Sequence, residues 1–120
     1  MRKRILVVED EEDNMQILRD LLAPGYELVE ADNGEKALVE AAKQRPDLIL
    51  MDIQLPIMDG YEATRRLKAD PALRSVPIIA ITSYALGQDE ARARAAGCDD
   101  FVAKPCSPRV LLAKIREYVS

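Results

Sequence analysis

Short runs of apolar residues alternate along the chain with stretches in which apolar residues recur every three or four positions. The runs predict buried strands at residues 4–8, 26–31, 48–51, 78–81 and 101–103, and the periodic stretches predict a helix after each strand. The four apolar residues at 48–51 are typical of a strand buried on both faces of a parallel sheet. Five strand–helix units in strict alternation predict an α/β protein, a doubly wound parallel sheet with helices on both faces.

The helix starts and buried faces are predicted from capping residues and apolar spacing. Gly97 is expected to end the fourth helix, and Pro108 to occupy the first turn of the fifth. The residues expected to cap or open the helices are Asp13, Asn33 with Gly34, Asp59 with Gly60, and Ser107. The expected apolar stripes are Ile17, Leu18, Leu21 and Leu22 in the first helix, Ala37, Leu38, Ala41 and Ala42 in the second, Ala63 and Leu67 in the third, Ala91, Ala95 and Ala96 in the fourth, and Leu111, Leu112, Ile115 and Val119 in the fifth.

Composition limits the classes of function open to this chain. Its 120 residues suffice for one domain with a single core, and a net charge of -4 argues against a general binder of nucleic acid or membrane surfaces. No apolar run is long enough for a membrane span or a signal peptide, so we expect a cytoplasmic protein. The absence of histidine excludes His-based catalytic triads and ordinary zinc sites. Cys98 and Cys106 form neither a CxxC pair nor a disulfide framework and are expected to be free thiols.

Acidic residues gather at the end of the first predicted strand. Glu11, Glu12 and Asp13 suit the first turn of a helix, whose dipole stabilises carboxylates. Glu9 and Asp10 lie at the strand tip itself, where close like charges are unfavourable unless a cation neutralises them. Mg²⁺ prefers oxygen ligands and typically uses one or two carboxylates together with phosphate oxygens. We therefore interpret this tip as a candidate site for a metal that can hold a phosphate.

Three further strand ends carry polar side chains. Asp52 follows the third strand, Thr82 ends the fourth, and Lys104 follows the fifth. Each residue alone has a structural reading, as a turn former, a strand residue or a surface charge. Ligands of open α/β sheets nevertheless bind at the carboxyl ends of the strands. Together with the acids, these residues suit a phosphoryl group on a carboxylate, because a metal and a lysine balance oxygen charge and a hydroxyl donates a hydrogen bond.

The same residues occur in a wider pattern that resembles the motifs of response-regulator receiver domains of two-component signalling, of the single-domain, chemotaxis-regulator-like kind. The motifs are Glu9–Asp10, Met51–Asp52 followed by Pro56 and Asp59–Gly60, Thr82–Ser83, and Phe101–Val102–Ala103–Lys104–Pro105. The resemblance runs from about residue 4 to residue 118 in the family's order and spacing. It implies a single receiver domain over residues 1–120 with the flavodoxin-like (βα)5 fold and strand order 2-1-3-4-5.

The resemblance also implies the chemistry. Asp52 would accept a phosphoryl group from a phosphohistidine on a sensor histidine kinase or histidine phosphotransfer protein, and this chain, lacking histidine, cannot be that donor. Mg²⁺ would be the cofactor, held by Asp10, Asp52 and the backbone carbonyl of Gln54, with Glu9 acting largely through water. Receivers often have two aspartates where this chain has Glu9–Asp10, so the longer Glu9 side chain alters the fine geometry. The chain would be a signalling switch and not a turnover enzyme.

The remaining motif residues would report the phosphoryl group. Lys104, placed by a cis bond to Pro105, would pair with its oxygens. Thr82 and Ser83 would approach it, and Phe101 would turn inward behind Thr82. These movements would shift the face formed by the helix 88–96, the strand 101–103 and the last helix, and so control binding of a protein target.

Family geometry also implicates two residues in the lifetime of the phosphorylated state. Gln54 lies two positions after the phosphoacceptor and Tyr84 two positions after the threonine. Both side chains are large and would obstruct the water that attacks phosphorus. The alternative is that both are ordinary exposed loop residues.

Three competing functions remain open at this stage. A flavin-binding electron carrier shares the fold class but needs a phosphate-cradling loop after the first strand, where this chain has five acids. A Mg²⁺-dependent aspartyl phosphatase needs a second aspartate two positions after the first, where Gln54 stands. A receiver-like interaction module that is never phosphorylated would carry the same residues. Whether the receiver acts alone or belongs to a larger protein also stays open.

Overall fold

The computed structural model describes residues 2–82, 87–103 and 107–119, and at 87–89 it describes the backbone alone. Strands and helices alternate throughout, as predicted. The elements are β1 (Arg4–Val8), α1 (Glu12–Leu22), β2 (Glu27–Ala31), α2 (Gly34–Lys43), β3 (Leu48–Asp52), α3 (Gly60–Ala69), β4 (Ile78–Thr82), α4 (Gly87–Ala96), β5 (Asp100–Ala103) and α5 (Pro108–Tyr118). Within these described ranges, no helix has both the length and the apolar character that a membrane span requires.

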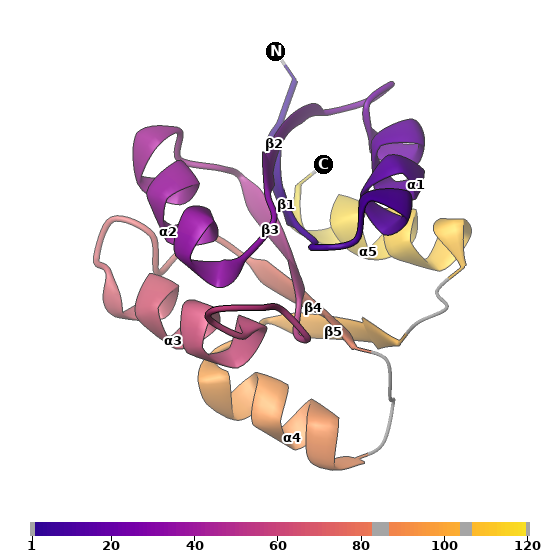
Figure 1. Cartoon of the computed structure of the whole chain (residues 1–120). Helices are drawn as coiled ribbons and strands as arrows, with labels where there is room; N and C mark the ends of the chain where they lie inside the picture. The colour runs from indigo at the N-terminus through magenta and orange to yellow at the C-terminus, as the bar shows by residue number, and fades with distance from the viewer. Residues whose placement is uncertain (1, 83–86, 104–106, 120) are drawn as a thin grey trace.

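The five strands form one parallel sheet in the order β2-β1-β3-β4-β5, which confirms the predicted topology. Helices α1 and α5 cover one face, and α2, α3 and α4 cover the other (Figure 1). In this order β3 lies between β1 and β4, with Val8 opposite Met51 and Asp52 opposite Ile81. The carboxyl ends of β1, β3 and β4 therefore meet at one edge of the sheet.

Strand β3 is buried at all five positions, as the apolar run predicts. Its side chains alternate between the two layers because successive strand residues point to opposite faces. Leu48 and Leu50 belong to the core beneath α1 and α5, whereas Ile49 and Met51 belong to the core beneath α2, α3 and α4. Asp52 is the last residue of the strand rather than the residue after it. A buried strand thus ends in a carboxylate.

Three of the predicted caps are confirmed. The side chain of Asn33 accepts a hydrogen bond from the backbone N–H of Lys36, and Asp59 accepts one from Glu62. Ser107 accepts one from the N–H of Arg109, with Pro108 at the helix start. The prediction for the first helix was wrong, because α1 begins at Glu12, its N-cap is Glu11, and Asp13 lies in the first turn. The Glu11 side chain makes no capping hydrogen bond to the backbone of α1.

The predicted apolar stripes were wrong at some positions, because not every apolar residue in the sequence of a helix faces the sheet. Ile17 is 62% exposed, since α1 turns Met15, Leu18 and Leu22 toward the sheet. Ala42 is exposed beside buried Ala41. In α4 the prediction named Ala91, Ala95 and Ala96, whereas the buried residues among the described side chains, 90–96, are Ala93 and Ala96.

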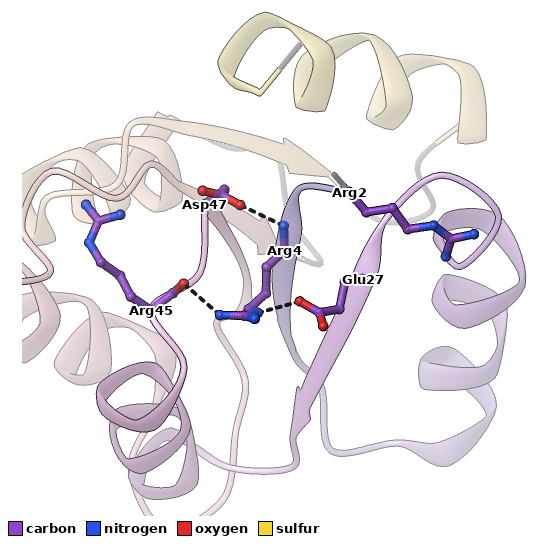
Figure 2. A pocket seen from close by; sticks show the side chains of 5 residues that line it. All are labelled: Arg2, Arg4, Glu27, Arg45 and Asp47. Atoms are coloured by element: carbon purple, nitrogen blue, oxygen red, sulfur yellow. Dashed lines mark hydrogen bonds and ion pairs between the residues drawn. The ribbon is translucent and has the colours of Figure 1, made fainter.

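The amino ends of the strands, opposite the acid tip, are joined by an ion pair and hydrogen bonds around a cavity of about 540 Å³ (Figure 2). The Arg4 guanidinium binds the Glu27 carboxylate on β2 and the carbonyl of Arg45. The backbone N–H of Arg4 donates to the Asp47 carboxylate. The cations here are therefore engaged within the protein, and these bonds tie β1 to β2 and to the segment that enters β3.

Candidate functional site

The site is built from three carboxylates at the ends of two neighbouring strands. Glu9 and Asp10 directly follow β1, and Asp52 ends β3. Each side chain offers one oxygen, and these three oxygens lie within 4.8 Å of one another. Glu9 is 2% exposed and Asp52 3% exposed, whereas Asp10 faces solvent. The structure therefore brings together the acids that the sequence predicts, with one open side.

Backbone hydrogen bonds hold the two buried carboxylates in place. The N–H of Glu11 donates to Glu9 Oε2 at 3.2 Å, and the N–H of Gln54 donates to Asp52 Oδ1 at 3.1 Å. The N–H of Glu9 is bonded to the carbonyl of Ala31, and that of Ile53 to the carbonyl of Ile81. The strand ladder thus continues one residue beyond β1 and β3 and fixes the backbone that carries the acids.

Helix α3 begins tightly against this tip. A Cβ atom at Gly60 would lie 2.4 Å from the carbonyl oxygen of Asp52 and 2.8 Å from Ile53 Cα. Both neighbours are backbone atoms, so a side chain at position 60 would force the loop or the strand end to move. The Gly60 N–H donates to the Ile53 carbonyl at 3.0 Å. Gly60 therefore allows the start of α3 to lie directly against the end of β3.

The acid cluster fits a hard cation. An octahedral Mg²⁺ with ligands at roughly 2.0–2.1 Å holds neighbouring oxygens about 2.9 Å apart and opposite oxygens about 4.2 Å apart. The oxygens of Glu9, Asp10 and Asp52 lie within 4.8 Å of one another, so side-chain rotation or an intervening water can bring all three to one ion. Three carboxylates this close also repel one another, and an oxygen-binding cation relieves that repulsion. The arrangement is compatible with Mg²⁺.

Thr82 and Phe101 lie on the far side of Asp52 from β1. Thr82 ends β4, is buried, and lines a cavity of about 360 Å³ together with Gln54 and Asp59. Phe101 lies on β5 opposite Ala80 and is partly buried against the core. The other predicted site residues, Ser83, Tyr84, Lys104 and Pro105, lie outside the described residues, as does the predicted free thiol Cys106.

One loop feature of the site is not predicted by the sequence. Ile57 has φ of 68°, and the N–H of Met58 donates to the Pro56 carbonyl at 2.7 Å, which makes Ile57 the central residue of a γ-turn. A β-branched residue in this region costs on the order of 1–3 kcal/mol. Ile57 is also 78% exposed. Sequence carries no signal for this turn, because isoleucine is among the residues that avoid positive φ.

A second unpredicted feature is an aromatic contact beside the cavity. The Arg92 guanidinium of α4 lies 4.3 Å from the centroid of the Tyr61 ring on α3, and Arg92 and Tyr61 both line the cavity that Thr82 lines. In sequence, Arg92 is one of several charged residues in an alanine-rich helix and reads as a solvated charge. Only the packing of α4 on α3 distinguishes it.

On the other side of the acid cluster, an ion pair ties α1 to β2. Arg19 binds both oxygens of Glu30 at 2.6 and 2.7 Å and also contacts Glu12. The hydrogen bonds from Arg19 lower the pKa of Glu30, and the carboxylates of Glu30 and Glu12 raise the pKa of Arg19. Asp32 forms its own pair with Lys36. Glu12, Glu30 and Asp32, on the β2 side of the cluster, are thus paired with neighbouring cations.

With this geometry in place, comparisons with known proteins decide the family. The family model of the response regulator receiver domain matches residues 5–116. This chain belongs to that family. The receiver is 47% identical over 120 residues to the polar-differentiation response regulator DivK of Brucella anthropi, covering 99% of this chain and 98% of DivK. The DivK protein of Brucella ovis is 45% identical over the same length.

Solved structures agree with this assignment. The receiver domain of sensor histidine kinase PA1611 from Pseudomonas aeruginosa, solved with magnesium in its active-site cleft, is 38% identical with a TM-score of 0.92, covering 98% of both chains. The signal receiver domain of a histidine kinase from Syntrophus aciditrophicus is 36% identical with a TM-score of 0.90, covering 98% of this chain and 89% of that one. The function of this domain is phosphoacceptor signalling, and its acid cluster is compatible with Mg²⁺.

Proposed function

We propose that Asp52 is the phosphoacceptor and that residues 1–120 form one receiver domain. The observation that carries this proposal is the meeting of Glu9, Asp10 and Asp52 within 4.8 Å at the ends of β1 and β3. Asp52 alone among these three ends a strand beside β4, whose last residue is Thr82. An Asp52 oxygen attacks phosphorus, the bond from phosphorus to the donor nitrogen breaks, and the donor imidazole regains a proton.

Asp10, Asp52 and the carbonyl of Gln54 would hold Mg²⁺, with Glu9 acting largely through water. When bound, the ion neutralises charge that accumulates on the phosphoryl oxygens. Glu9 is buried and its carboxylate accepts a hydrogen bond from the N–H of Glu11, so it is held at the cluster but less open to solvent than Asp10. Asp10 faces solvent and can reach an ion that enters from the open side of the cluster, which supports it as a direct ligand.

The proposed donors are a sensor histidine kinase or a histidine phosphotransfer protein. The chain has no histidine of its own. Two similar structures are named as receiver domains of histidine kinases. We infer a switch that assists its own phosphotransfer and slow dephosphorylation, and does not turn over a separate substrate.

The phosphoryl group would be read by Thr82, Ser83 and Lys104, with Phe101 turning inward. Phosphorylation adds nearly two negative charges at the tip. Bonds to those charges form only in the phosphorylated state, so they favour a second arrangement of the α4–β5–α5 face. Thr82 ends a strand that pairs with both β3 and β5, which supports transmission in this direction.

Gln54 and Tyr84 would set the lifetime of the phosphorylated state by obstructing the attacking water. Gln54 supports this role by lining the cavity beside Thr82. Tyr84→Ala, alone or with Gln54→Ala, should speed phosphate loss after the donor is removed, measured at constant Mg²⁺. Equal or slower loss in both variants would contradict the role.

The test of the proposed function is the intact mass of the protein after incubation with acetyl phosphate and Mg²⁺. The wild type should gain one phosphate, Asp52→Asn should gain none, and Asp32→Asn, which alters an exposed acid outside the cluster, should behave as the wild type. A receiver-like module that is never phosphorylated would show no gain in the wild type. Labelling of Asp52→Asn at a comparable rate would contradict the assignment of the acceptor.

A further inference from the structure

Helix α4 has small buried contacts with the rest of the domain. Among its side chains that the structure describes, those of residues 90–96, Ala93 and Ala96 are the buried ones. Each contributes one methyl group to the core. Helices α1, α3 and α5 each bury larger apolar side chains, and α2 buries Ala37 and Ala41 with Leu38 partly buried against the core. The described side chains of α4 add no such larger apolar contact, so its position depends more on contacts that its charged side chains make.

The strongest such contact among the described residues is the stack of Arg92 on Tyr61. The guanidinium carbon lies 4.3 Å from the ring centroid, within the range of a cation–π interaction. Tyr61 is 5% exposed, so its ring is fixed in the core, whereas Arg92 reaches it from the surface of α4. On the other side of α4, Arg94 lies 5.8 Å from the Phe101 ring and is paired with Glu90. The closer contact is the one to α3.

Tyr61 is anchored to the phosphoacceptor strand. It is the second residue of α3 and follows Gly60, whose N–H is bonded to the Ile53 carbonyl at 3.0 Å. The space at Gly60 is closed by the carbonyl oxygen of Asp52. The ring therefore keeps its place relative to Asp52, and the Arg92–Tyr61 stack ties α4 to a fixed point beside the acceptor.

A cavity lies between this fixed point and the end of β4. Its volume is about 360 Å³, and Thr82 and Arg92 both line it, with Gln54 and Leu55 from the loop after β3. Helix α4 follows β4 in the chain and lies beside α3 (Figure 1). Because Thr82, Arg92 and Tyr61 line the same cavity, a movement of Thr82 toward Asp52 changes the space beside the Arg92–Tyr61 stack.

We propose that Arg92 is a positioning residue of the switch: its stack on Tyr61 holds α4 in the unphosphorylated arrangement and thereby disfavours phosphorylation of Asp52. The proposal rests on the proposed function of Asp52. Phosphorylation and the position of α4 are linked, so a contact present only in the resting arrangement opposes both the movement and the modification. The strength of a cation–π contact at an exposed site corresponds to about a two- to fivefold change in an equilibrium ratio.

The first test needs no phosphorylation. Native hydrogen exchange of peptides covering 87–97 should be about two- to fivefold faster in Arg92→Ala than in the wild type, with the remaining peptides unchanged. Arg65→Ala is the matched control, because Arg65 is an exposed arginine of α3 paired with Glu62 and contacts no described ring. Tyr61→Leu should reproduce the effect. In the double variant the two changes should not add, since each removes the same contact.

The second test is the initial rate of phosphorylation by acetyl phosphate with Mg²⁺. In the proposal, the population of the shifted arrangement limits the rate at which Asp52 accepts phosphate, so Arg92→Ala should be about two- to fivefold faster than the wild type. Arg92→Lys should be intermediate, because a lysine keeps the charge but not the planar stack, and Arg65→Ala should be unchanged. The proposal would be overturned if α4 of Arg92→Ala exchanged at the wild-type rate, or if the effects of the two substitutions added in the double variant. It would also be overturned if Arg92→Ala exchanged faster but was phosphorylated at the wild-type rate. Failure of the wild type to accept phosphate would contradict the phosphoacceptor role instead, and the exchange experiment would still show whether the stack holds α4.

Discussion

Helices α4 and α5 flank the same strand, β5, but they are held by different forces. Helix α5 buries Leu111 and Ile115 completely, and the Ser107 side chain caps its start. The described part of α4 buries two alanines and reaches two aromatic rings through arginines. Burial of a Leu or Ile side chain contributes about 1.5–3 kcal/mol, against about 0.8 kcal/mol for one methyl group. The difference indicates that α5 is attached to the sheet more strongly than the described part of α4. Under the proposed function, α4 is therefore the part of the α4–β5–α5 face that we expect to move.

The largest expected effect lies on the fixed side. Ile115→Ala should lower the free energy of unfolding by about 2–5 kcal/mol, because it leaves a cavity at a fully buried position. Urea denaturation measures this. Val110→Ala on the same helix removes an exposed side chain and should change the free energy by less than about 0.5 kcal/mol. Equal losses in both variants would contradict the assignment of the buried face of α5.

The junction between Asp52 and α3 should be nearly as sensitive. Gly60→Ala places a methyl group against the backbone of Asp52 and should cost about 1–3 kcal/mol. Gly25→Ala is the control, because a Cβ there meets no atom within 4 Å, and it should be neutral or stabilising by up to about 1 kcal/mol. The same urea series compares them. A Gly60→Ala protein as stable as Gly25→Ala would show that the junction yields easily and that Tyr61 is not fixed.

Smaller losses are expected on α4. Ala93→Gly should cost about 1.5–2 kcal/mol, the sum of a helix propensity term and one buried methyl group. Ala95→Gly, at an exposed position of the same helix, should cost about 0.8–1.0 kcal/mol from propensity alone. The difference of the two unfolding free energies isolates the contribution of packing. A difference comparable to that measured at Ile115 would contradict the weak attachment of α4.

The smallest effect concerns the exposed tie between α1 and β2. Arg19 lowers the pKa of Glu30, so the unfolded state binds the proton more readily and the pair stabilises the protein above the ordinary glutamate pKa. This contribution is lost as the pH falls through the lowered pKa of Glu30. Glu30→Gln should therefore lower the melting temperature slightly at neutral pH and leave it unchanged in acid. A difference that grows in acid would contradict the sign.

Most of the fold could be predicted from the chain, because the buried strands and the caps at Asn33, Asp59 and Ser107 are local patterns. The acids of the site could also be named, since parallel topology brings strand ends together. The exposure of Ile17 and the buried face of α4 could not, because they depend on how each helix is rotated about its axis when it packs on the sheet. Nor could the Arg92–Tyr61 stack or the γ-turn at Ile57, since neither is preferred by its residues and both arise from packing.

The central claim is that phosphorylation of Asp52 changes the position of α4. Hydrogen exchange of peptides from α1, α4 and α5, measured with and without acetyl phosphate at constant Mg²⁺, tests it directly, with Asp52→Asn as the control. Phosphorylation should change the exchange of α4 in the wild type more than that of α5, leave α1 unchanged, and have no effect on Asp52→Asn. Unchanged exchange in α4 of the fully phosphorylated protein, or the same change in Asp52→Asn, would contradict the account.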